Sequence, residues 1–438
     1  MSVSSLPFLH GALAAVLPKL AAWRRDFHAH PEAGWTEFRT AALIIRRLRE
    51  LGYAIRMGEA ACASDRRMGV PSSAVLAAAR ERALEHGADA ELVAGMGDGY
   101  TGFWADLDCG PGPVTAFRFD MDCNEVAECA EESHRPVREG FASRWPGLMH
   151  ACGHDGHAAV GLGLAEVLVS IRRHLRGRIR LIFQPAEEGA RGALPMSEAG
   201  AVDGVDVLFG FHIGFKAEGP GSLICGTQGF LATTKRDVLF SGVPAHAGAA
   251  PEEGKDALLA ACSAVVNLHA ISRNGKGGTR IAVGRLEGGE ARNVIPASAR
   301  LFMETRGETT ELDAYMTAES ERILRASADL WGCACEWRTV GNSAGGGSSP
   351  ELARLIATVA EAMGGWKTVI PMSGFGATED FACLMSRVQA SGGLASYLQV
   401  GTDRAAGHHS DRFDFDETCL GRALELLARL AVRMAGGG

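Results

Sequence analysis

Short apolar runs alternate with amphipathic stretches along the first half of the chain and again near its end. Three of these runs are VTAFRF (residues 114–119), IRLIFQ (179–184) and VDVLFGF (205–211). The stretches AALIIRRLRELG and GLGLAEVLVSIRRHL carry apolar residues at helical spacing. Strands that alternate with helices predict an α/β domain with a mainly parallel sheet and covering helices.

Between residues 229 and 343 the pattern indicates strand, helix, strand, strand, helix and strand. The segments are TTKRDVLFSG, KDALLAACSAVVNLHAIS, GTRIAVGRLEG, SARLFMETRG, ELDAYMTAESERILRASADLW and CACEWRTVG. This βαββαβ order is typical of a complete ferredoxin-like domain, here inserted into the larger one. We therefore expect a discontinuous catalytic α/β domain, residues 1–228 and 344–438, and an inserted α+β domain, residues 229–343.

Two features of the inserted region give narrower predictions. Five residues of its first helix share one face at helical spacing, as the apolar face of an amphipathic helix does. They are Leu258, Cys262, Val265, Val266 and His269. The Gly- and Ser-rich segment NSAGGGSSP, residues 342–350, is expected to be a flexible return linker.

Polar clusters follow the three apolar runs of the larger domain. FDMD follows the first run, QPAEEG the second and FHIG the third. Because open α/β sheets bind their ligands at the carboxyl ends of the strands, these clusters are candidates for a binding site. The segment from Ala60 to Gly102 contains one Ala- and Glu-rich helix and gives no indication of its role.

Composition excludes several classes of function. The 438 residues, 47% hydrophobic and 22% charged, indicate a soluble globular protein long enough for two domains. A formal net charge of -8 argues against nucleic-acid binding. No apolar run approaches the roughly 18 residues of a membrane span. The eleven cysteines follow no disulfide framework and no secretory leader opens the chain, so we expect a reducing cytoplasm.

The segment MHACGHDGHAA, residues 149–159, concentrates candidate chemistry. It is compatible with a redox thiol, a structural zinc site, a catalytic metal site or a polar loop. Cys152 and His154 are two residues apart and cannot share a helix face, but Gly153 lets the backbone bend so that both side chains point inward. A cysteine this close to a histidine, at the foot of a helix, favours a metal ligand over an inert thiol.

The rest of the segment allows structural explanations. Asp155 is placed to cap a helix that begins at Gly156. His157 lies three residues after His154, where it is either part of the cluster or a helix-surface histidine.

Further candidate ligands stand at the exits of other apolar runs. Glu187 and Glu188 are adjacent, so in an extended segment their side chains point in opposite directions. His212 follows an apolar run, and His408 and His409 precede a carboxylate-rich segment. Each alone has an ordinary structural explanation, but together with Cys152 they favour a metal site in one α/β domain.

The sequence resembles the dinuclear metallopeptidase superfamily of aminoacylases and glutamate carboxypeptidases, in its amidohydrolase branch with hippurate and indole-acetyl-amino-acid hydrolases. The matching segments, in the family's order, are RRDFHAHPEAGWTE, FRFDMD, MHACGHDGHAA, FQPAEEGARGA, FHIG, GVPAHAGAAPEEGKDA, NVIP, ATEDF and HHSDRFDFDE. Within the branch, the Ser-His pair and the GFAS segment that precede MHACGHDGHA, with the long insert after Ala60, are similar to the A subunits of p-aminobenzoyl-glutamate hydrolases.

The resemblance implies two divalent metal ions per protomer, zinc or manganese. Its metal ligands would be Cys152, His154, Glu188, His212 and His409. Of the two adjacent histidines His409 is chosen, because the family's ligand directly precedes a small or polar residue, here Ser410. Glu187 would be the general base, and Asp122 would support the site from behind the ligands. Some relatives have a metal-binding histidine at the position of Asp120, so a metal contact of Asp120 is left open.

The resemblance also implies substrate-binding residues in the inserted domain, which would be a lid or dimerisation domain. His246 would stabilise the oxyanion, from the same protomer or from the partner of a dimer. Asn293 and Arg306 would hold the substrate carboxylate. Because the whole chain is acidic, the site would need local positive charge from Arg306, the metals and Lys235 or Arg236.

The implied function is that of a cytoplasmic two-metal amidohydrolase that cleaves an N-acyl or N-aroyl amino acid, most specifically p-aminobenzoyl-glutamate. One alternative changes the substrate to hippurate or another N-acyl amino acid. Another is a non-catalytic metal-binding component of a hetero-oligomer, against which Glu187 argues because a scaffold needs no base. A thiol oxidoreductase is a third alternative, but it would need a CxxC pair or another cysteine close to Cys152, and the sequence has none there. The implied assembly is a homodimer, or a heterodimer with a paralogous B subunit.

Overall fold

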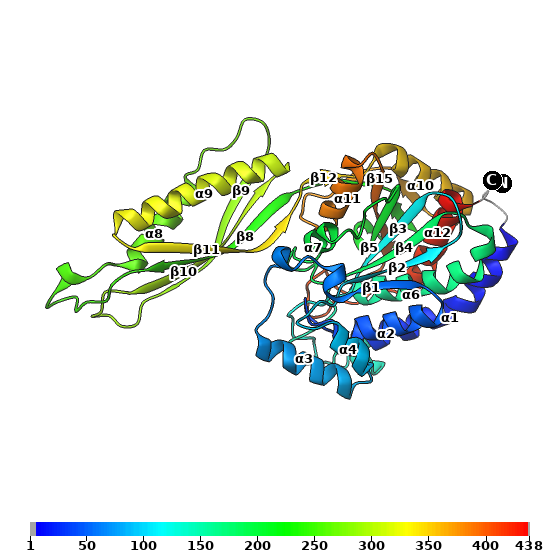
Figure 1. The fold of residues 1–438 in the computed structure, drawn as a ribbon, viewed down its shortest axis with the longest axis horizontal. Helices are drawn as coiled ribbons and strands as arrows, with labels where there is room; N and C mark the ends of the chain where they lie inside the picture. Colours follow the sequence, from blue (N-terminus) through cyan, green and yellow to red (C-terminus); the bar gives the residue numbers. More distant parts are fainter. Residues whose placement is uncertain (1–5, 437–438) are drawn as a thin grey trace. The chain divides into compact units, whose positions relative to one another are not determined.

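The computed structural model describes the chain from Leu6 to Gly436. Residue contacts divide the chain into two compact units (Figure 1). The first consists of Met1–Gln228, Gly347–Phe375 and Cys383–Gly438, and the second of Gly229–Gly346 and Gly376–Ala382. The catalytic role expected for the first unit and the lid or dimerisation role expected for the second stay predictions.

An eight-stranded mixed sheet forms the centre of the first unit, in the order β1-β2-β4-β3-β5-β15-β6-β13. Its strands are β1 (Ala54–Met57), β2 (Phe103–Asp108), β3 (Val114–Asp120), β4 (Arg178–Gln184), β5 (Val207–Glu218), β6 (Ser222–Ile224), β13 (Thr368–Ile370) and β15 (Leu394–Thr402). The three apolar runs of the sequence are β3, β4 and β5, and β3 pairs in parallel with both others. β15 adds a further parallel partner to β5, whereas β2 is antiparallel to β4. The predicted α/β class with a mainly parallel sheet is confirmed.

Helices cover this sheet. The α-helices before and after residues 229–346 are α1 (Pro7–Ala29), α2 (Phe38–Glu50), α3 (Ser73–Glu85), α4 (Ala90–Gly95), α5 (Arg135–Arg138), α6 (His154–Ser170), α7 (Ala193–Glu198), α10 (Pro350–Met363), α11 (Phe381–Ala390) and α12 (Thr418–Ala435). Short 3-10 helices are η1 (Gly58–Ala61), η2 (Ser64–Arg66), η3 (Arg172–His174) and η4 (Pro251–Glu253). None of the described helices has the length and hydropathy that a bilayer span requires.

Helix α6 is buried at every position from His154 to Leu168, and it packs against α1, α12 and β3. Figure 1 shows α1 and α6 side by side. Gly161 permits the close approach to the sheet, because a Cβ at this position would lie 2.8 Å from the ring of Phe119. The first turn of α6, which carries His154, is therefore held against the carboxyl end of β3.

The second unit has a four-stranded antiparallel sheet in the order β11-β8-β10-β9, with α8 and α9 packed on it (Figure 1). Its elements are β8 (Ala232–Ser241), α8 (Ala257–His269), β9 (Thr279–Gly288), β10 (Ser298–Gly307), α9 (Thr310–Leu330) and β11 (Ala334–Ser343). All six elements of the predicted βαββαβ order are present, and the order is as predicted.

The prediction of the apolar face of the first helix of this unit, α8, is wrong. Val266 is 72% exposed and Leu258 is only half-buried. The buried residues of α8 are Ala257, Ala260, Ala261, Ala264 and Leu268. Small side chains let the helix axis lie close to the sheet, so the alanine face packs inward although the larger residues are more hydrophobic.

The prediction of a flexible return linker at residues 342–350 is wrong as well, because part of this segment forms paired strands. Asn342 and Ser343 extend β11, and Gly346–Gly347 forms β12. β12 belongs to a small sheet in the order β12-β7-β14, with β7 (Thr227–Phe230) and β14 (Ser373–Gly374). The Ser348 hydroxyl accepts hydrogen bonds from the backbone of Thr227 at 2.9 Å and Tyr397 at 3.0 Å. Serine side chains thus anchor a segment whose composition suggested freedom.

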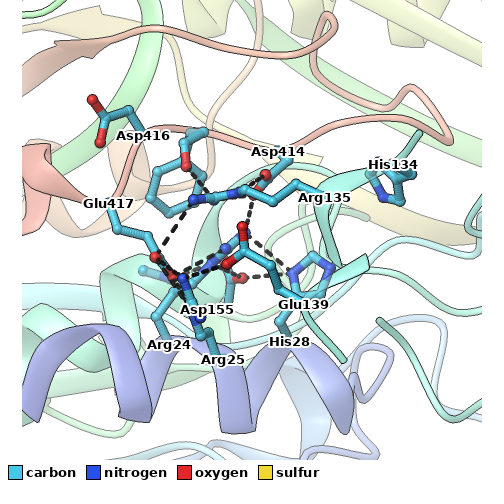
Figure 2. A network of polar contacts seen from close by, with 12 residues as sticks. Arg24, Arg25, His28, His134, Arg135, Glu139, Asp155, Asp414, Asp416 and Glu417 are labelled. Atoms are coloured by element: carbon cyan, nitrogen blue, oxygen red, sulfur yellow. Dashed lines mark hydrogen bonds and ion pairs between the residues drawn. The ribbon is translucent and has the colours of Figure 1, made fainter. Parts of the chain in front are cut away.

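A buried network of charges ties three distant segments of the first unit together (Figure 2). Arg24 on α1 is fully buried. Its guanidinium donates to Asp155 at 2.8 Å and to Asp414 at 2.9 Å, and it lies 3.4 Å from Glu417. Arg135 donates to the same Asp414 carboxylate at 2.5 Å. Asp155 belongs to the first turn of α6 and Asp414 to the loop before α12, so Arg24 fixes the distance between these two segments.

A second branch of the network starts at His28, one turn after Arg24. Its Nδ1 lies 2.8 Å from Asp155, and its Nε2 lies 3.0 Å from Glu128. Glu128 also contacts His134 Nε2 at 2.9 Å and accepts from the backbone N–H of Ser143 at 2.5 Å. His134 of the Ser-His pair and Ser143 of the GFAS segment therefore converge on one buried carboxylate.

The close packing of α6 on the sheet is tested by Gly161→Ala. We expect the added methyl group to lower the free energy of unfolding by about 1–3 kcal/mol, because the ring of Phe119 must move. Gly11→Ala in α1 is the matched control, since a Cβ there meets no atom within 4 Å. It should raise stability by about 0.5–1 kcal/mol through helix propensity. Denaturant unfolding measures both, and equal effects would contradict the packing argument.

The network is tested by Arg24→Met against Arg25→Met on the same helix. Removal of Arg24 leaves Asp155 and Asp414 buried without their main cation, so we expect a loss of about 3–5 kcal/mol in the free energy of unfolding. The Arg25 side chain is 34% exposed and also pairs with Glu417, so its loss should cost within about 1 kcal/mol. Similar midpoints for the two variants in denaturant unfolding would show that burial of the Arg24 charge does not matter.

Candidate metal centre

The predicted ligand clusters meet at the carboxyl ends of β3, β4 and β5. Asp122 follows β3, Glu187 and Glu188 follow β4, and His212 lies within β5. The other three predicted ligands come from loops and a helix start. They are Cys152 before α6, His154 at its first residue, and His409 in the loop between β15 and α12. Strand register and the backbone hydrogen bond from His409 to the Ala151 carbonyl thus place residues that are more than 250 positions apart in one region.

The turn that precedes α6 has the expected bend, but the expected helix cap is wrong. Gly153 has φ 92°, in the left-handed region that favours glycine, and α6 begins at His154 rather than at Gly156. Asp155 accordingly lies inside the first turn. Its Oδ2 accepts from Arg24, and Arg24 keeps the pKa of this carboxyl far below its usual range although burial opposes the shift.

The ligand atoms of the predicted residues lie close together. Cys152 Sγ is 3.4 Å from His212 Nε2, and His409 Nε2 is 3.3 Å from Glu188 Oε2. His154 Nε2 is 3.8 Å from Glu188 Oε1 and 3.9 Å from Glu187 Oε2. Cys152, Glu188 and His409 form one group whose ligand atoms all lie within 4.8 Å of one another, and His154 forms another with Glu187 and Glu188.

Several of these atoms lack a partner that the chain itself can provide. Among the described residues, His154 Nε2, Glu188 Oε1 and Asp122 Oδ1 are buried without a hydrogen bond. Unpaired buried polar atoms destabilise a fold, and these three belong to residues that lie next to one another around His154. Burial, and then the carboxylate of Glu188, raise the pKa of the Cys152 thiol well above its usual range. A divalent cation would satisfy the orphaned atoms and favour the thiolate, so the residues present fit a metal site.

The imidazole rings are oriented as metal ligands commonly are. His154 Nδ1 donates to the backbone carbonyl of Asp122 at 2.9 Å, and His212 Nδ1 donates to the carbonyl of Ile213 at 2.8 Å. A proton on Nδ1 leaves Nε2 as the free lone pair, and metal-binding histidines typically have such a partner on their second nitrogen. Both Nε2 atoms point to the cluster.

Backbone strain marks the same place. Within the described chain, five residues other than glycine have a positive φ angle. Three of them adjoin or belong to the cluster, namely Ala186 (φ 51°), Ala190 (φ 56°) and His409 (φ 64°). The first two enclose Glu187 and Glu188, so this turn directs the two carboxylates. Such strain is typical of functional sites, where the surrounding structure enforces it.

Asp120 has protein partners on both carboxylate oxygens. Oδ2 accepts from Arg118 at 2.5 Å, and Oδ1 lies 2.5 Å from His157 Nδ1. His157 Nε2 in turn accepts from the backbone N–H of Ile213 at 2.9 Å. The helix-surface alternative for His157 is therefore wrong: the ring is buried and joins α6 to β3 and β5. Asp120 is thus held by protein contacts, and with His154 and His157 it also forms a group whose ligand atoms lie within 4.8 Å of one another, so a metal contact of Asp120 stays open.

The two adjacent C-terminal histidines have different surroundings. His408 Nδ1 accepts from Arg404 at 2.9 Å, and its Nε2 donates to the Ile213 carbonyl at 3.2 Å. His408 also lies within 4.8 Å of Cys152 and His212, so distance alone does not separate the two histidines. The ring of His409 is 58% exposed and faces Glu188. The satisfied nitrogens of His408 favour His409 as the ligand.

Glu37 is a residue of the site that sequence reasoning missed, although it lies in the quoted segment RRDFHAHPEAGWTE. Its buried carboxyl accepts from Thr101 at 2.6 Å and from the backbone N–H of Ala186 at 2.9 Å. It thereby holds the strained turn before Glu187. Burial, and then the nearby carboxylate of Asp122, raise the pKa of Glu37 to about 8. Asp122 itself accepts from the backbone N–H of Glu188 at 3.0 Å.

The predicted substrate-binding residues lie in the second unit. His246 and Asn293 are neighbours, since residue 246 bridges to Val294 and the Asn293 carbonyl accepts from Ala247 at 3.0 Å. Arg306 lies on β10, where it donates to Glu304 at 2.8 Å. Their substrate roles stay predictions. Of the two suggested additional cations, Arg236 is buried and ion-paired with Glu321 at 2.6 Å, and Lys235 is half-buried.

Comparison with known proteins agrees with this geometry. The model of the peptidase family M20/M25/M40 matches residues 116–433. The chain is 46% identical over 420 residues to the A subunit of p-aminobenzoyl-glutamate hydrolase from Escherichia coli, with 95% of this chain and 96% of the relative covered. It is 44% identical over 429 residues to an indole-3-acetyl-aspartic acid hydrolase of Enterobacter agglomerans, with 98% of both chains covered.

Solved structures agree as well. An aminobenzoyl-glutamate utilization protein from Klebsiella pneumoniae superposes with a TM-score of 0.84 at 40% identity, over 97% of this chain and 98% of that one. A dinuclear metal binding peptidase of the M20 family from Bacillus subtilis superposes with a TM-score of 0.65 at 25% identity, over 96% and 99%. The resemblance noted in the sequence is confirmed: the chain belongs to peptidase family M20/M25/M40 and is a dinuclear metal-dependent hydrolase.

Proposed function

We propose that this hydrolase cleaves the amide bond of an N-acyl or N-aroyl amino acid, with p-aminobenzoyl-glutamate as its main substrate and p-aminobenzoate and glutamate as products. The observation that carries the proposal is the cluster of orphaned ligand atoms beside Glu187. The two relatives named above support the substrate class. Their names specify substrates with different acyl groups, yet in both substrates an amide bond joins an aromatic acid to an acidic amino acid.

The metal site proposed here holds two divalent ions, zinc or manganese. The ligands are Cys152, His154, Glu188, His212 and His409. A thiolate and imidazoles favour zinc, whereas the carboxylate also suits manganese. When bound, such a pair of ions lowers the pKa of a water molecule and polarises the amide carbonyl.

Glu187 is the proposed general base. Its carboxylate lies beside Glu188 and 3.9 Å from His154 Nε2, and its side chain is 13% exposed. It takes the proton of the attacking water and delivers it to the leaving nitrogen. Asp122 supports this arrangement through the backbone of Glu188 and the ring of His154, from which it is 3.0 Å and 3.4 Å away.

The second unit supplies the remaining proposed roles. His246 donates a hydrogen bond to the oxyanion, and Asn293 and Arg306 hold the α-carboxylate of the substrate. We assign residues 229–343 the role of a lid or dimerisation domain. β9 ends the four-stranded sheet and offers a strand edge for pairing. The assembly is a homodimer, or a heterodimer with a paralogous B subunit, and the relative from Escherichia coli, which is itself an A subunit by name, supports the second form.

A reducing cytoplasm is the proposed location. All eleven cysteines are free in the structure, although several lie in half-buried positions. Proteins of oxidising compartments commonly use such residues for disulfides, so free thiols favour a reducing compartment.

The proposed function is tested by an assay of p-aminobenzoyl-glutamate and hippurate with protein stripped of metal and then resupplied with manganese or zinc. Turnover of p-aminobenzoyl-glutamate should need metal. Glu187→Gln should lower kcat by about 100-fold or more while metal content stays the same, because only the proton acceptor is lost. Elemental analysis measures the metal content.

Other outcomes of this assay choose among the alternatives. Faster turnover of hippurate would keep the mechanism and refute the proposed substrate. Tight metal binding without turnover of either compound would favour a non-catalytic component, or an enzyme that needs its paralogous partner. Addition of that partner would distinguish these two.

A further inference from the structure

A pocket of about 780 Å³ in the first unit reaches the candidate metal centre. Asp122, Glu188 and His409 line one part of it. Another part is formed by the segment between Ala60 and Gly102, to which the sequence assigned no role. Pockets of this size commonly hold small ligands. The segment therefore adjoins the site where the amide bond of a substrate would lie.

Helix α3 presents one face to this pocket. The face consists of Val75, Ala79 and Arg82, and Ser72, the residue that caps the helix, continues it. Their spacing of three or four positions places them in one row, because such residues are neighbours on a helix surface. The row is apolar except at its ends. At the far end the Arg82 guanidinium lies 5.2 Å from the centre of the Trp145 ring, a cation–π contact that orients it.

Arg191 brings a second guanidinium to the same pocket from the turn after Glu188. Its Nη1 donates to the Gly69 carbonyl at 3.3 Å, and its Nε is buried without a hydrogen-bond partner within the described chain. The side chain lies flat on glycine backbone. A Cβ at Gly189 would lie 1.8 Å from Nε, and one at Gly69 would lie 3.1 Å from Nη1.

Among the described residues, neither arginine has a carboxylate oxygen within 4.0 Å, although Arg82 is close enough to the buried Glu32 to stabilise its carboxylate. The buried Arg24 and Arg118, in contrast, each form a salt bridge with an aspartate. The pocket also contains Asp122, Glu125 and Glu188, which repel an anion. Two guanidinium groups that line one pocket and form no salt bridge with a described carboxylate indicate a ligand that supplies one.

We propose that Arg191 and Arg82 bind the side-chain carboxylate of an acidic amino-acid substrate and so select N-acyl glutamate or aspartate over neutral analogues. This inference rests on the proposed amidohydrolase function. There, Asn293 and Arg306 hold the α-carboxylate, so the second carboxylate of the substrate needs another site. The segment from Ala60 to Gly102 thus acts as a specificity element, which supplies Arg82 and the Gly69 carbonyl that positions Arg191.

The test compares p-aminobenzoyl-glutamate with p-aminobenzoyl-glutamine, which has the same shape but no side-chain charge. Metal-loaded wild-type protein should prefer the acid. In Arg191→Gln and in Arg82→Gln, kcat/KM for the acid should fall about tenfold or more, mainly through KM, while the value for the amide stays unchanged. Arg191→Lys, which retains the charge, should restore part of the preference.

Arg66→Gln is the control from the same segment, since its side chain is 56% exposed and does not line the pocket. It should leave both substrates unaffected. Equal losses on the acid and the amide in the Arg191 and Arg82 variants would mean that these residues only maintain the fold, and unchanged preference would likewise overturn the proposal.

Binding separates this inference from the proposed hydrolysis. Calorimetry with metal-loaded Glu187→Gln protein measures the affinity for both compounds without turnover. Tighter binding of the acid, lost when Arg191→Gln is added, would support the pocket even if the wild-type protein cleaves neither compound. Equal affinity for the acid and the amide would overturn the assignment of the pocket.

Discussion

The buried Arg24 guanidinium is the constraint on which the geometry of the site depends. A charge this far from water is tolerated only when carboxylates surround it, and Arg24 meets Asp155 and Asp414 from segments 131 and 390 positions away. Asp155 adjoins His154, and Asp414 stands five positions after His409. Because these acids cannot leave the arginine without exposing an unpaired buried charge, the two segments that carry candidate ligands are held in register.

The centre itself is arranged in the opposite way. Arg24 is fully paired, whereas His154, Glu188 and Asp122 each keep one buried atom without a partner in the described chain. The turn around Glu187 and Glu188 is strained, and Glu37 holds it through the backbone of Ala186. Polar groups with full hydrogen bonding thus surround candidate ligand atoms that have no hydrogen-bond partner. This contrast is what a site for divalent cations requires, since the ions supply the missing interactions.

The segment from Ala60 to Gly102 adds a second kind of recognition to this frame. The metal cluster suits any amide, because it interacts with atoms that all N-acyl amino acids share. Arg82 and Arg191 instead line the pocket and form no salt bridge with the described residues. In the proposal, the two functions are therefore separate in space, because the metal ligands act on the amide and the two arginines act on the side-chain carboxylate.

The sequence by itself determined the strands β3, β4 and β5, the βαββαβ unit and the candidate ligands, because period and motif are local properties of a chain. Only the tertiary structure decided that Asp155 pairs with Arg24, that His157 is buried against Asp120, and that α8 packs through alanines. It also brought Arg191 and Arg82 to one pocket. These outcomes depend on partners distant in sequence and on the space between packed elements, which no local pattern encodes.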